Sequence, residues 1–238
     1  MEIKQSITVL DNSDVAHKID FLIDSVDLSG LVALDEAGKE YSLKKNEFAL
    51  ETIVLDCGAG YGEFSIECAL KGAFKVFAFE PNLNLVKLLS FNTSTFPSIQ
   101  VCPSGAWIED KDSWLHFRIS GTASASINEI QFDPMSKIGK ERIKVRVSLI
   151  DLGKVIDEIA TEYPHSLLAL KLDIEGAEHR LLTYLSETKR LEKLQKIWVE
   201  YHYEHQNLLD LLSPEFTTMS VQHKGSGIGL IHAERSFR

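Results

Sequence analysis

Short, nearly continuous apolar runs of the kind that form buried parallel strands recur along the chain. They are residues 52–57, 75–79, 99–102, 167–173 and 194–200. Between them lie segments with an apolar residue at every third or fourth position, which predicts helices. These are residues 62–71, 83–95, 151–163, 177–185 and 204–212. Strands that alternate with helices in this way predict a parallel sheet with helices on both faces.

The C-terminal part of the chain adds a different pattern to this alternation. Residues 216–223 and 228–235, joined by a glycine-containing turn, read as an antiparallel hairpin that brings the sheet to seven strands. The expected fold is therefore α/β, a doubly wound, Rossmann-like, mostly parallel sheet with a C-terminal antiparallel hairpin. We expect it to occupy residues 51–238 as one domain.

Two segments of the chain are expected to add to this core. Residues 1–50 contain apolar positions with helical spacing, which predicts a mainly helical segment that covers the site or packs on the sheet. These positions are Val15, Ile19, Leu22 and Ile23. An insertion is expected around residues 114–147, where two strand-like segments flank a polar stretch. We expect that stretch to form a hairpin or a loop near the site.

The motif Asp56-Cys57-Gly58-Ala59-Gly60 follows the first predicted strand and leads into a predicted helix. Glycines tolerate a positive φ and let the backbone approach a ligand closely, and a helix N-terminus offers free N–H groups. Glu80 ends the second predicted strand, where a carboxylate can accept hydrogen bonds from both hydroxyls of a ribose. Pro81 and Asn82 then stop the strand and cap the next helix. Together these elements predict a site for an adenosine-containing cofactor.

Asp56 indicates which kind of cofactor this site holds. In nicotinamide sites a pyrophosphate lies at the helix N-terminus, and an acid just before the glycines would repel it. A ligand that carries an ammonium or a sulfonium group would be attracted instead. The residues favour the cationic ligand, and a nicotinamide-dependent oxidoreductase is the alternative.

These motifs resemble those of a known family. The stretch Asp56–Gly60 is similar to the first motif of class I S-adenosylmethionine-dependent methyltransferases, and Glu80-Pro81-Asn82 resembles their second, acidic motif. Lys171–Glu178 is similar to the hallmark of the FkbM-type methyltransferases, and Ile197–His202 resembles their next strand. The resemblance implies S-adenosylmethionine as the donor, S-adenosylhomocysteine as the product, and O-methylation of a sugar or other small natural-product-like acceptor. A methyltransferase-like binding module without turnover is a further alternative.

The residues that would hold the donor follow from the position of the predicted strands, because ligands of open α/β sheets bind at the carboxyl ends. Asp56 and the glycines are expected at the methionine part, and Glu80 at the ribose. The resemblance places the adenine beside Gly105, Ala106 and Trp107, and plain core packing is the alternative for Trp107. The full set of expected donor-binding residues is Asp56, Cys57, Gly58, Ala59, Gly60, Glu80, Pro81, Asn82, Gly105, Ala106, Trp107 and Asp173.

Asp173, Glu175 and His202 are the expected catalytic residues. A hydroxyl acceptor has a pKa that is too high for reaction at neutral pH, so a base or a metal must help. Asp173 or His202 is the candidate base, and Glu175 is a second base, an orienting group or simply a helix-start acid. Together with Glu200 these residues have the character of a magnesium or manganese site. Their spacing does not demand a metal, however, and none is predicted.

Composition limits the classes of partner. The chain has 238 residues and a net charge of −10. This charge argues against a general polyanion binder, so nucleic acid is predicted to be an unlikely partner and a small molecule the expected one. Basic residues gather in one stretch, which favours either an acidic or phosphorylated acceptor or a solvated strand edge. They are Lys137, Lys140, Arg142, Lys144 and Arg146.

The cysteines and the apolar runs of the chain indicate in which cellular compartment the protein is expected. Cys57, Cys68 and Cys102 lack the spacing of a metal site or of a disulfide framework. No secretory leader pattern is visible, and no apolar run approaches the length that crosses a bilayer. We therefore expect a cytoplasmic protein without a membrane partner.

Overall fold

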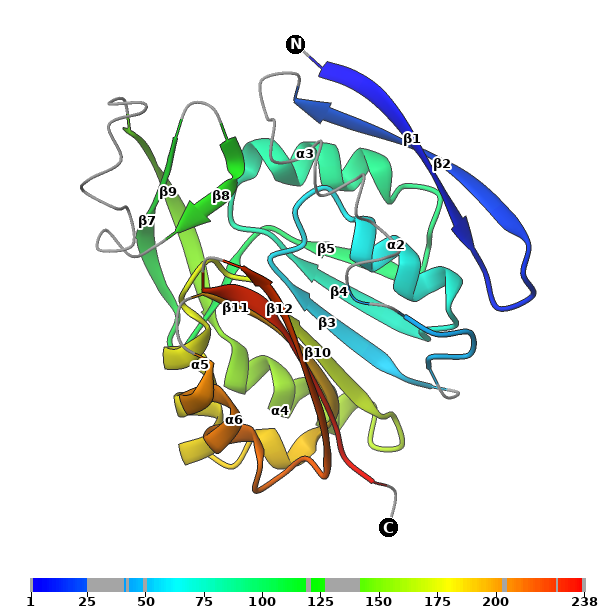
Figure 1. Cartoon of the computed structure of the whole chain (residues 1–238). Coiled ribbons are helices and arrows are strands. Elements are labelled where there is room, and N and C mark those ends of the chain that lie inside the picture. Colours follow the sequence, from blue (N-terminus) through cyan, green and yellow to red (C-terminus); the bar gives the residue numbers. More distant parts are fainter. Residues whose placement is uncertain are drawn as a thin grey trace.

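The computed structural model describes residues 2–24, 41, 43–48, 51–118, 121–126, 142–202, 205–225 and 227–236. A seven-stranded sheet in the order β12-β13-β11-β10-β3-β4-β5 forms the centre of the molecule (Figure 1). Its strands are β3 (Ile53–Cys57), β4 (Lys75–Phe79), β5 (Ile99–Cys102), β10 (Leu168–Leu172), β11 (Leu194–His202), β12 (Thr218–Gly225) and β13 (Ile228–Glu234).

The pairing of these strands confirms the predicted fold class. β10 is parallel to both β11 and β3, and the parallel pairing continues through β4 to β5. β13 lies antiparallel between β11 and β12, which is the predicted closing hairpin. Every residue of β3 and β10 is buried, because these strands lie in the middle of a sheet that is covered on both faces.

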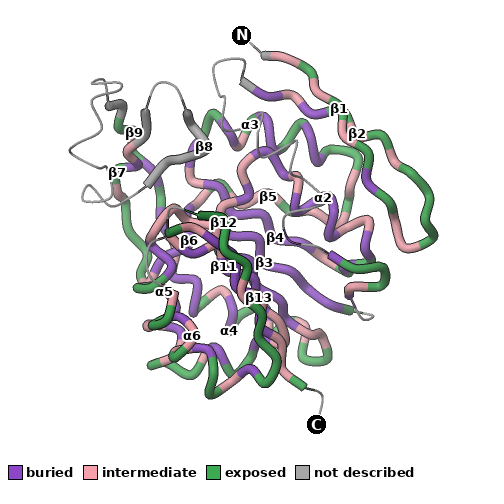
Figure 2. The backbone as a smooth tube through the Cα atoms, in the orientation of Figure 1, coloured by how far each residue is buried: buried purple, intermediate pink, exposed green. Residues whose placement is uncertain are grey.

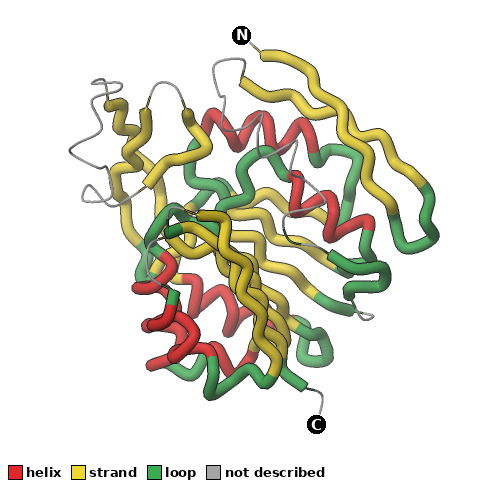
Figure 3. The backbone as a smooth tube through the Cα atoms, in the orientation of Figure 1, coloured by secondary structure: helices red, strands yellow, loops and turns green. Residues whose placement is uncertain are grey.

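Helices cover both faces of this sheet (Figures 1 and 3). Leu55 of β3 packs in one cluster with Leu152 and Leu181, whereas its neighbour Val54 packs with Phe64 on the opposite face. Successive side chains of a strand point to opposite faces of the sheet, so these two neighbours contact different helix layers. The helices are α2 (Glu63–Leu70) and α3 (Leu83–Asn92) on one face, and α4 (Leu152–Glu162), α5 (Glu178–Glu187) and α6 (Gln206–Leu212) on the other. Figure 2 shows the buried backbone concentrated in the central strands.

The N-terminal segment differs from its prediction. Residues 2–24 form an antiparallel hairpin of β1 (Glu2–Leu10) and β2 (Ala16–Asp24), so the helix predicted from Val15 to Ile23 is wrong. Phe21 and Ile23 alternate inward and pack with Ile66 and Leu85, on the outside of α2 and α3. The spacing of the apolar residues in this segment is compatible with a helix and with a strand. Packing of the segment against the helix layer favours the strand.

The insertion forms a second, four-stranded sheet in the order β6-β9-β7-β8. Its strands are β6 (Gly105–Trp107), β7 (Lys111–Arg118), β8 (Gly121–Ser126) and β9 (Arg142–Asp151). The two strands expected here are confirmed as β7 and β9, which pair antiparallel. Residues 127–141, with Lys137 and Lys140, lie outside the described part of the chain. Among the described residues, no helix combines the length and the apolar character that a membrane span requires.

Candidate functional site

The predicted site residues meet at one edge of the central sheet. Asp56 pairs in register with Lys171, and Cys57 pairs with both Phe79 and Leu172. The carboxyl ends of β3, β4 and β10 therefore lie side by side, and the segments that follow them come together at this edge. The small sheet is joined to the same region, because β6 follows β5 after two residues.

The glycine loop after β3 is pressed against the loop after β10. Gly58 has φ +84°, and a Cβ atom at this position would lie 1.8 Å from the backbone oxygen of Asp173. The N–H groups of Gly58 and Ala59 both donate to the carbonyl of Phe79, each at 3.0 Å. Only glycine fits this approach, and the loop is thereby fixed between two strands.

Asp56 is fully buried and forms the base of this loop. It accepts a hydrogen bond from Ser65 Oγ at 2.6 Å, and its other oxygen lies 3.4 Å from Lys171 Nζ. Lys171 also donates to the carbonyl of Gly58 at 2.7 Å and lies 3.3 Å from Asp173 Oδ2. One buried ammonium group thus links the first glycine of the loop to Asp56 of β3 and to Asp173 just after β10.

Glu80 lies at the carboxyl end of β4 and is buried. Its oxygens accept hydrogen bonds from the N–H groups of Gly60 at 3.1 Å and Asn82 at 2.8 Å. Burial raises the pKa of this carboxyl to about 7, against the opposing effect of the two backbone donors. Asn82 caps α3 as expected, because its side-chain oxygen accepts from Asn84 N–H.

The segment predicted to hold adenine forms β6, and its three residues are buried. A Cβ atom on Gly105 would lie 2.7 Å from Leu149 and 3.3 Å from Pro81, so Gly105 lies against the segment that follows β4. Trp107 packs in the core of the small sheet with Leu115 and neighbours. Its indole Nε1 finds no hydrogen-bond partner among the described residues.

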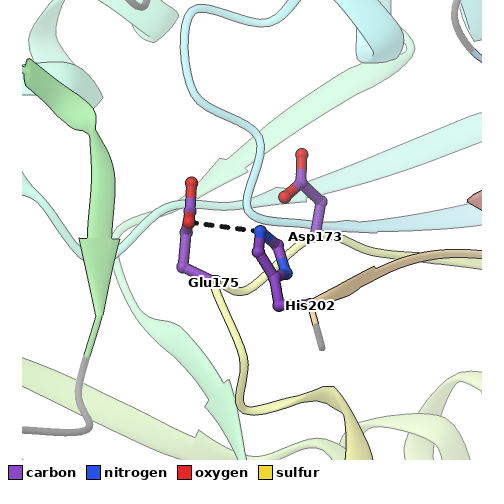
Figure 4. Close-up of side chains that lie close together, drawn as sticks. All are labelled: Asp173, Glu175 and His202. Carbon is purple, nitrogen blue, oxygen red and sulfur yellow. Dashed lines mark ion pairs between the residues drawn. The ribbon is translucent and has the colours of Figure 1, made fainter. Parts of the chain in front are cut away.

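Asp173, Glu175 and His202 converge beside this edge (Figure 4). Asp173 and Glu175 come from the loop after β10, and His202 is the last residue of β11. The imidazole Nε2 lies 3.3 Å from Glu175 Oε2, and Nδ1 lies 3.3 Å from an oxygen of Glu178. One ligand atom from each of Asp173, Glu175 and His202 lies within 4.8 Å of the others.

The charges in this cluster shift its pKa values in different directions. Burial lowers the pKa of His202, but its two glutamate partners outweigh this and raise it to about 11. Burial would raise the pKa of Asp173, but Lys171 and further partners bring it to about 2. Burial and the Asp173 charge raise the pKa of Glu200 to about 8. In this state the imidazole is protonated and Asp173 is ionised.

Three residues of this region were missed by the sequence analysis as members of the site. Lys171 could have been recognised from the sequence, because a lysine within an apolar strand, two residues before an acid, is unusual. Tyr41, whose hydroxyl donates to Asp173 Oδ2 at 3.2 Å, gave none because it comes from the N-terminal segment. Glu178 reads as an ordinary helix-start acid. Glu200, expected to orient His202, instead lies 2.9 Å from Lys224 and shares a hydrogen bond with Asp173.

A match to a protein-family model identifies the family of this chain. The model described as the methyltransferase FkbM domain matches residues 56–220, which is more than half of the chain. The chain belongs to the FkbM methyltransferase family. It is an S-adenosylmethionine-dependent methyltransferase, with S-adenosylhomocysteine as the product. The nicotinamide alternative is thereby wrong.

Solved structures similar to this FkbM methyltransferase include other methyltransferases. An rRNA methylase from Streptococcus thermophilus is 12% identical, with 78% of this chain and 87% of that chain covered and a TM-score of 0.43. The T. thermophilus 16S rRNA N2 G1207 methyltransferase, in complex with AdoMet and guanosine, is 15% identical, with 98% and 51% covered and a TM-score of 0.43. TrmK from M. capricolum, in complex with S-adenosylhomocysteine, is 11% identical, with 80% and 65% covered and a TM-score of 0.41. No curated protein sequence matches this chain significantly.

One prediction about partners is corrected by these structures. Nucleic acid was expected to be an unlikely partner because the net charge is −10. The similar structures include two enzymes named for rRNA, so this expectation is wrong. The net charge averages over the whole surface and does not describe the surface that meets an acceptor.

Proposed function

We propose that this FkbM methyltransferase transfers the methyl group of S-adenosylmethionine to a hydroxyl oxygen of a sugar or small natural-product-like acceptor. The observation that carries the proposal is the contact of Gly58 with the backbone of Asp173. It brings the glycine loop, which would hold the donor, against the loop that carries the Asp173–Glu175–His202 cluster. A methyl group held by the first loop would therefore lie beside polar groups that can handle a hydroxyl.

The donor would lie along the carboxyl ends of β3 to β5. The backbone of Cys57, Gly58, Ala59 and Gly60 would line its methionine part, with Asp56 fixing the loop from below through Ser65 and Lys171. Glu80 would exchange its bond to Gly60 N–H for bonds from the ribose hydroxyls. The adenine would lie near Pro81 and Asn82 and the backbone of Gly105 and Ala106, with Trp107 behind it.

The acceptor would approach from the side of Asp173, Glu175 and His202. In the reaction the hydroxyl oxygen bonds to the methyl carbon as the carbon–sulfur bond breaks, and S-adenosylhomocysteine leaves. The hydroxyl proton passes to the carboxylate of Glu175, because burial raises the pKa of this group whereas Lys171 keeps that of Asp173 low. Since the donor is already activated, the main contribution of the protein is alignment of oxygen, carbon and sulfur.

The first test is calorimetric titration of the full chain with S-adenosylhomocysteine, in a buffer without divalent metal. We expect saturable binding to the wild type and at least tenfold weaker binding to Glu80→Gln. Glu162→Gln, an exposed change at the end of α4, serves as the control and should leave the affinity unchanged.

The second test identifies the acceptor with methyl-labelled donor. The panel contains glycosides, aliphatic and phenolic alcohols, amines, carboxylic acids, and ribosomal and transfer RNA. Stable methyl ethers on small hydroxyl compounds support the proposal. Donor binding without transfer to any class would establish a binding module instead, and transfer only to nitrogen, to carboxylates or to RNA would overturn the proposed acceptor.

A further inference from the structure

We propose that Asp173, Glu175 and His202 form a binding site for one divalent cation of the manganese or magnesium type. The site lies on the acceptor side of the glycine loop, and its role in catalysis rests on the proposed function, whereas cation binding itself does not. Two carboxylates and one imidazole combine the oxygen ligands that manganese and magnesium prefer with a nitrogen ligand that transition metals accept.

The distances in the cluster suit a single ion. Six-coordinate cations of this type hold their ligands at about 2.1 Å, so neighbouring ligand atoms lie about 3 Å apart and opposite ones about 4.2 Å apart. Glu175 Oε2 and His202 Nε2 are 3.3 Å apart, and the set including Asp173 lies within 4.8 Å. Figure 4 shows the three side chains facing one another. Small side-chain movements would bring all three to one ion.

Glu178 supplies an independent reason to expect a metal at this place. Its side chain is almost fully buried, and one oxygen accepts from the N–H groups of Ile174 and Gly176, each at 3.0 Å. The same oxygen lies 3.3 Å from His202 Nδ1. A carboxylate fixed behind a histidine in this way orients the other ring nitrogen, as it does for metal-binding histidines. Here Nε2 is turned toward Glu175.

Without a cation the imidazole lies 3.3 Å from one oxygen of each of the two glutamates. A cation that binds Nε2 would lie between the imidazole and Glu175 and would leave Nδ1 facing Glu178. The geometry therefore accommodates both states without a change of rotamer at His202.

The balance of fixed charges points the same way. The described residues that form the site include five carboxylates and two lysines in contact with them. These are Asp56, Asp173, Glu175, Glu178 and Glu200, with Lys171 and Lys224. When the imidazole is neutral, as it is when it binds a cation, the carboxylates outnumber the two lysines even if Glu200 is protonated, and a divalent cation would offset the difference where water is partly excluded. It would also bind the acceptor oxygen and lower the pKa of a hydroxyl.

The test is a titration of the full chain with Mn²⁺ in the absence of donor, with the free ion measured by electron paramagnetic resonance. We expect one Mn²⁺ per chain, displaced by excess Mg²⁺. Glu175→Gln and His202→Gln should weaken the affinity at least a hundredfold. Glu178→Gln should weaken it about ten- to a hundredfold, because it removes only the group that orients the imidazole. Glu162→Gln is the matched exposed control and should bind as the wild type.

Each variant is also titrated with S-adenosylhomocysteine, which shows that it is folded. Absence of saturable Mn²⁺ binding, or equal binding by His202→Gln, would overturn the inference. If donor binding and methyl transfer persist with a chelator present and no Mn²⁺ binds, the cation site is wrong and the proposed function stands. If Mn²⁺ binds as expected but no hydroxyl is methylated, the cation site stands and the proposed acceptor is wrong.

Discussion

At the scale of single residues, Glu80 shows how burial competes with hydrogen bonding. Two backbone donors favour its ionised form, yet loss of water raises its pKa to about 7. The proposed contact with the ribose of the donor requires the ionised form of Glu80 as a hydrogen-bond acceptor. The residue that the sequence assigned to the ribose is therefore poised to make donor binding depend on pH near neutrality.

We predict that the affinity for S-adenosylhomocysteine falls as the pH is lowered from 8 to 6, approaching about tenfold per pH unit below 7. The free energy of unfolding of the donor-free protein should instead decrease as the pH rises. The folded-state pKa lies above the ordinary value of 4.5, so the contribution of Glu80 is present below pH 4.5 and is lost as the pH rises to about 7. Calorimetry over this pH range measures the affinity. Glu80→Gln should remove the dependence; an unchanged pH profile in this variant would assign it to another group.

Gly58 gives a second prediction at this scale. Gly58→Ala should destabilise the fold by about 2–4 kcal/mol, because the residue has φ +84° and its Cβ would lie 1.8 Å from the Asp173 oxygen. Donor binding should be lost as the loop moves. Gly225→Ala is a matched control, since Gly225 has φ +98° with nothing within 4 Å of an added Cβ. It should cost only about 1 kcal/mol in urea denaturation. Equal losses in the two variants would show that backbone strain matters here and the close contact does not.

At the scale of elements, Lys171 couples two neighbouring strands. It extends from β10 to the buried Asp56 of β3 and to the glycine loop. Its aliphatic stem occupies a buried position of the strand, while its ammonium donates to the Gly58 carbonyl and forms an ion pair with the buried Asp56. The alternation of strands and helices predicted these elements within a few residues of their observed ends, but it did not predict this link.

Lys171→Met should lower the free energy of unfolding by about 3–5 kcal/mol, because it leaves Asp56 as an unpaired buried charge. The double variant Lys171→Met/Asp56→Asn should recover part of this loss. Lys154→Met removes an exposed lysine whose partner Asp110 is also exposed, and should be almost neutral. Urea denaturation measures all three. A double variant less stable than Lys171→Met alone would contradict the charge-pair explanation.

At the scale of the whole molecule, the candidate site lies at one edge of the central sheet, and the N-terminal hairpin forms a separate outer layer. The β1–β2 hairpin lies outside α2 and α3 (Figure 1) and is fixed to them by apolar contacts and by Asn92. The side chain of Asn92 pairs with both backbone groups of Leu22. Substitutions in this hairpin should therefore change the free energy of unfolding without changing the affinity for the donor.

Phe21→Ala should lower the free energy of unfolding by about 3–5 kcal/mol, since Phe21 is fully buried. Its affinity for S-adenosylhomocysteine should stay that of the wild type at a temperature where the variant is folded. Leu10→Ala on the same hairpin is the control, because Leu10 is 48% exposed, and it should leave stability nearly unchanged. Thermal unfolding and calorimetry give the two readouts. Loss of donor affinity in folded Phe21→Ala would mean that the hairpin shapes the site.

The sequence by itself determined the central fold and the position of the glycine loop after β3. Hydrophobic period, strand order and the placement of Asp56, Gly58 and Glu80 are properties of adjacent residues, and short-range geometry fixes them. The structure confirmed each predicted strand and helix from residue 53 onward. Only the tertiary structure decided the rest: the hairpin of residues 2–24, the role of Lys171 and Tyr41, and the meeting of Glu178 with His202. Packing between segments distant in the chain creates these features, and no local pattern records which segments will meet.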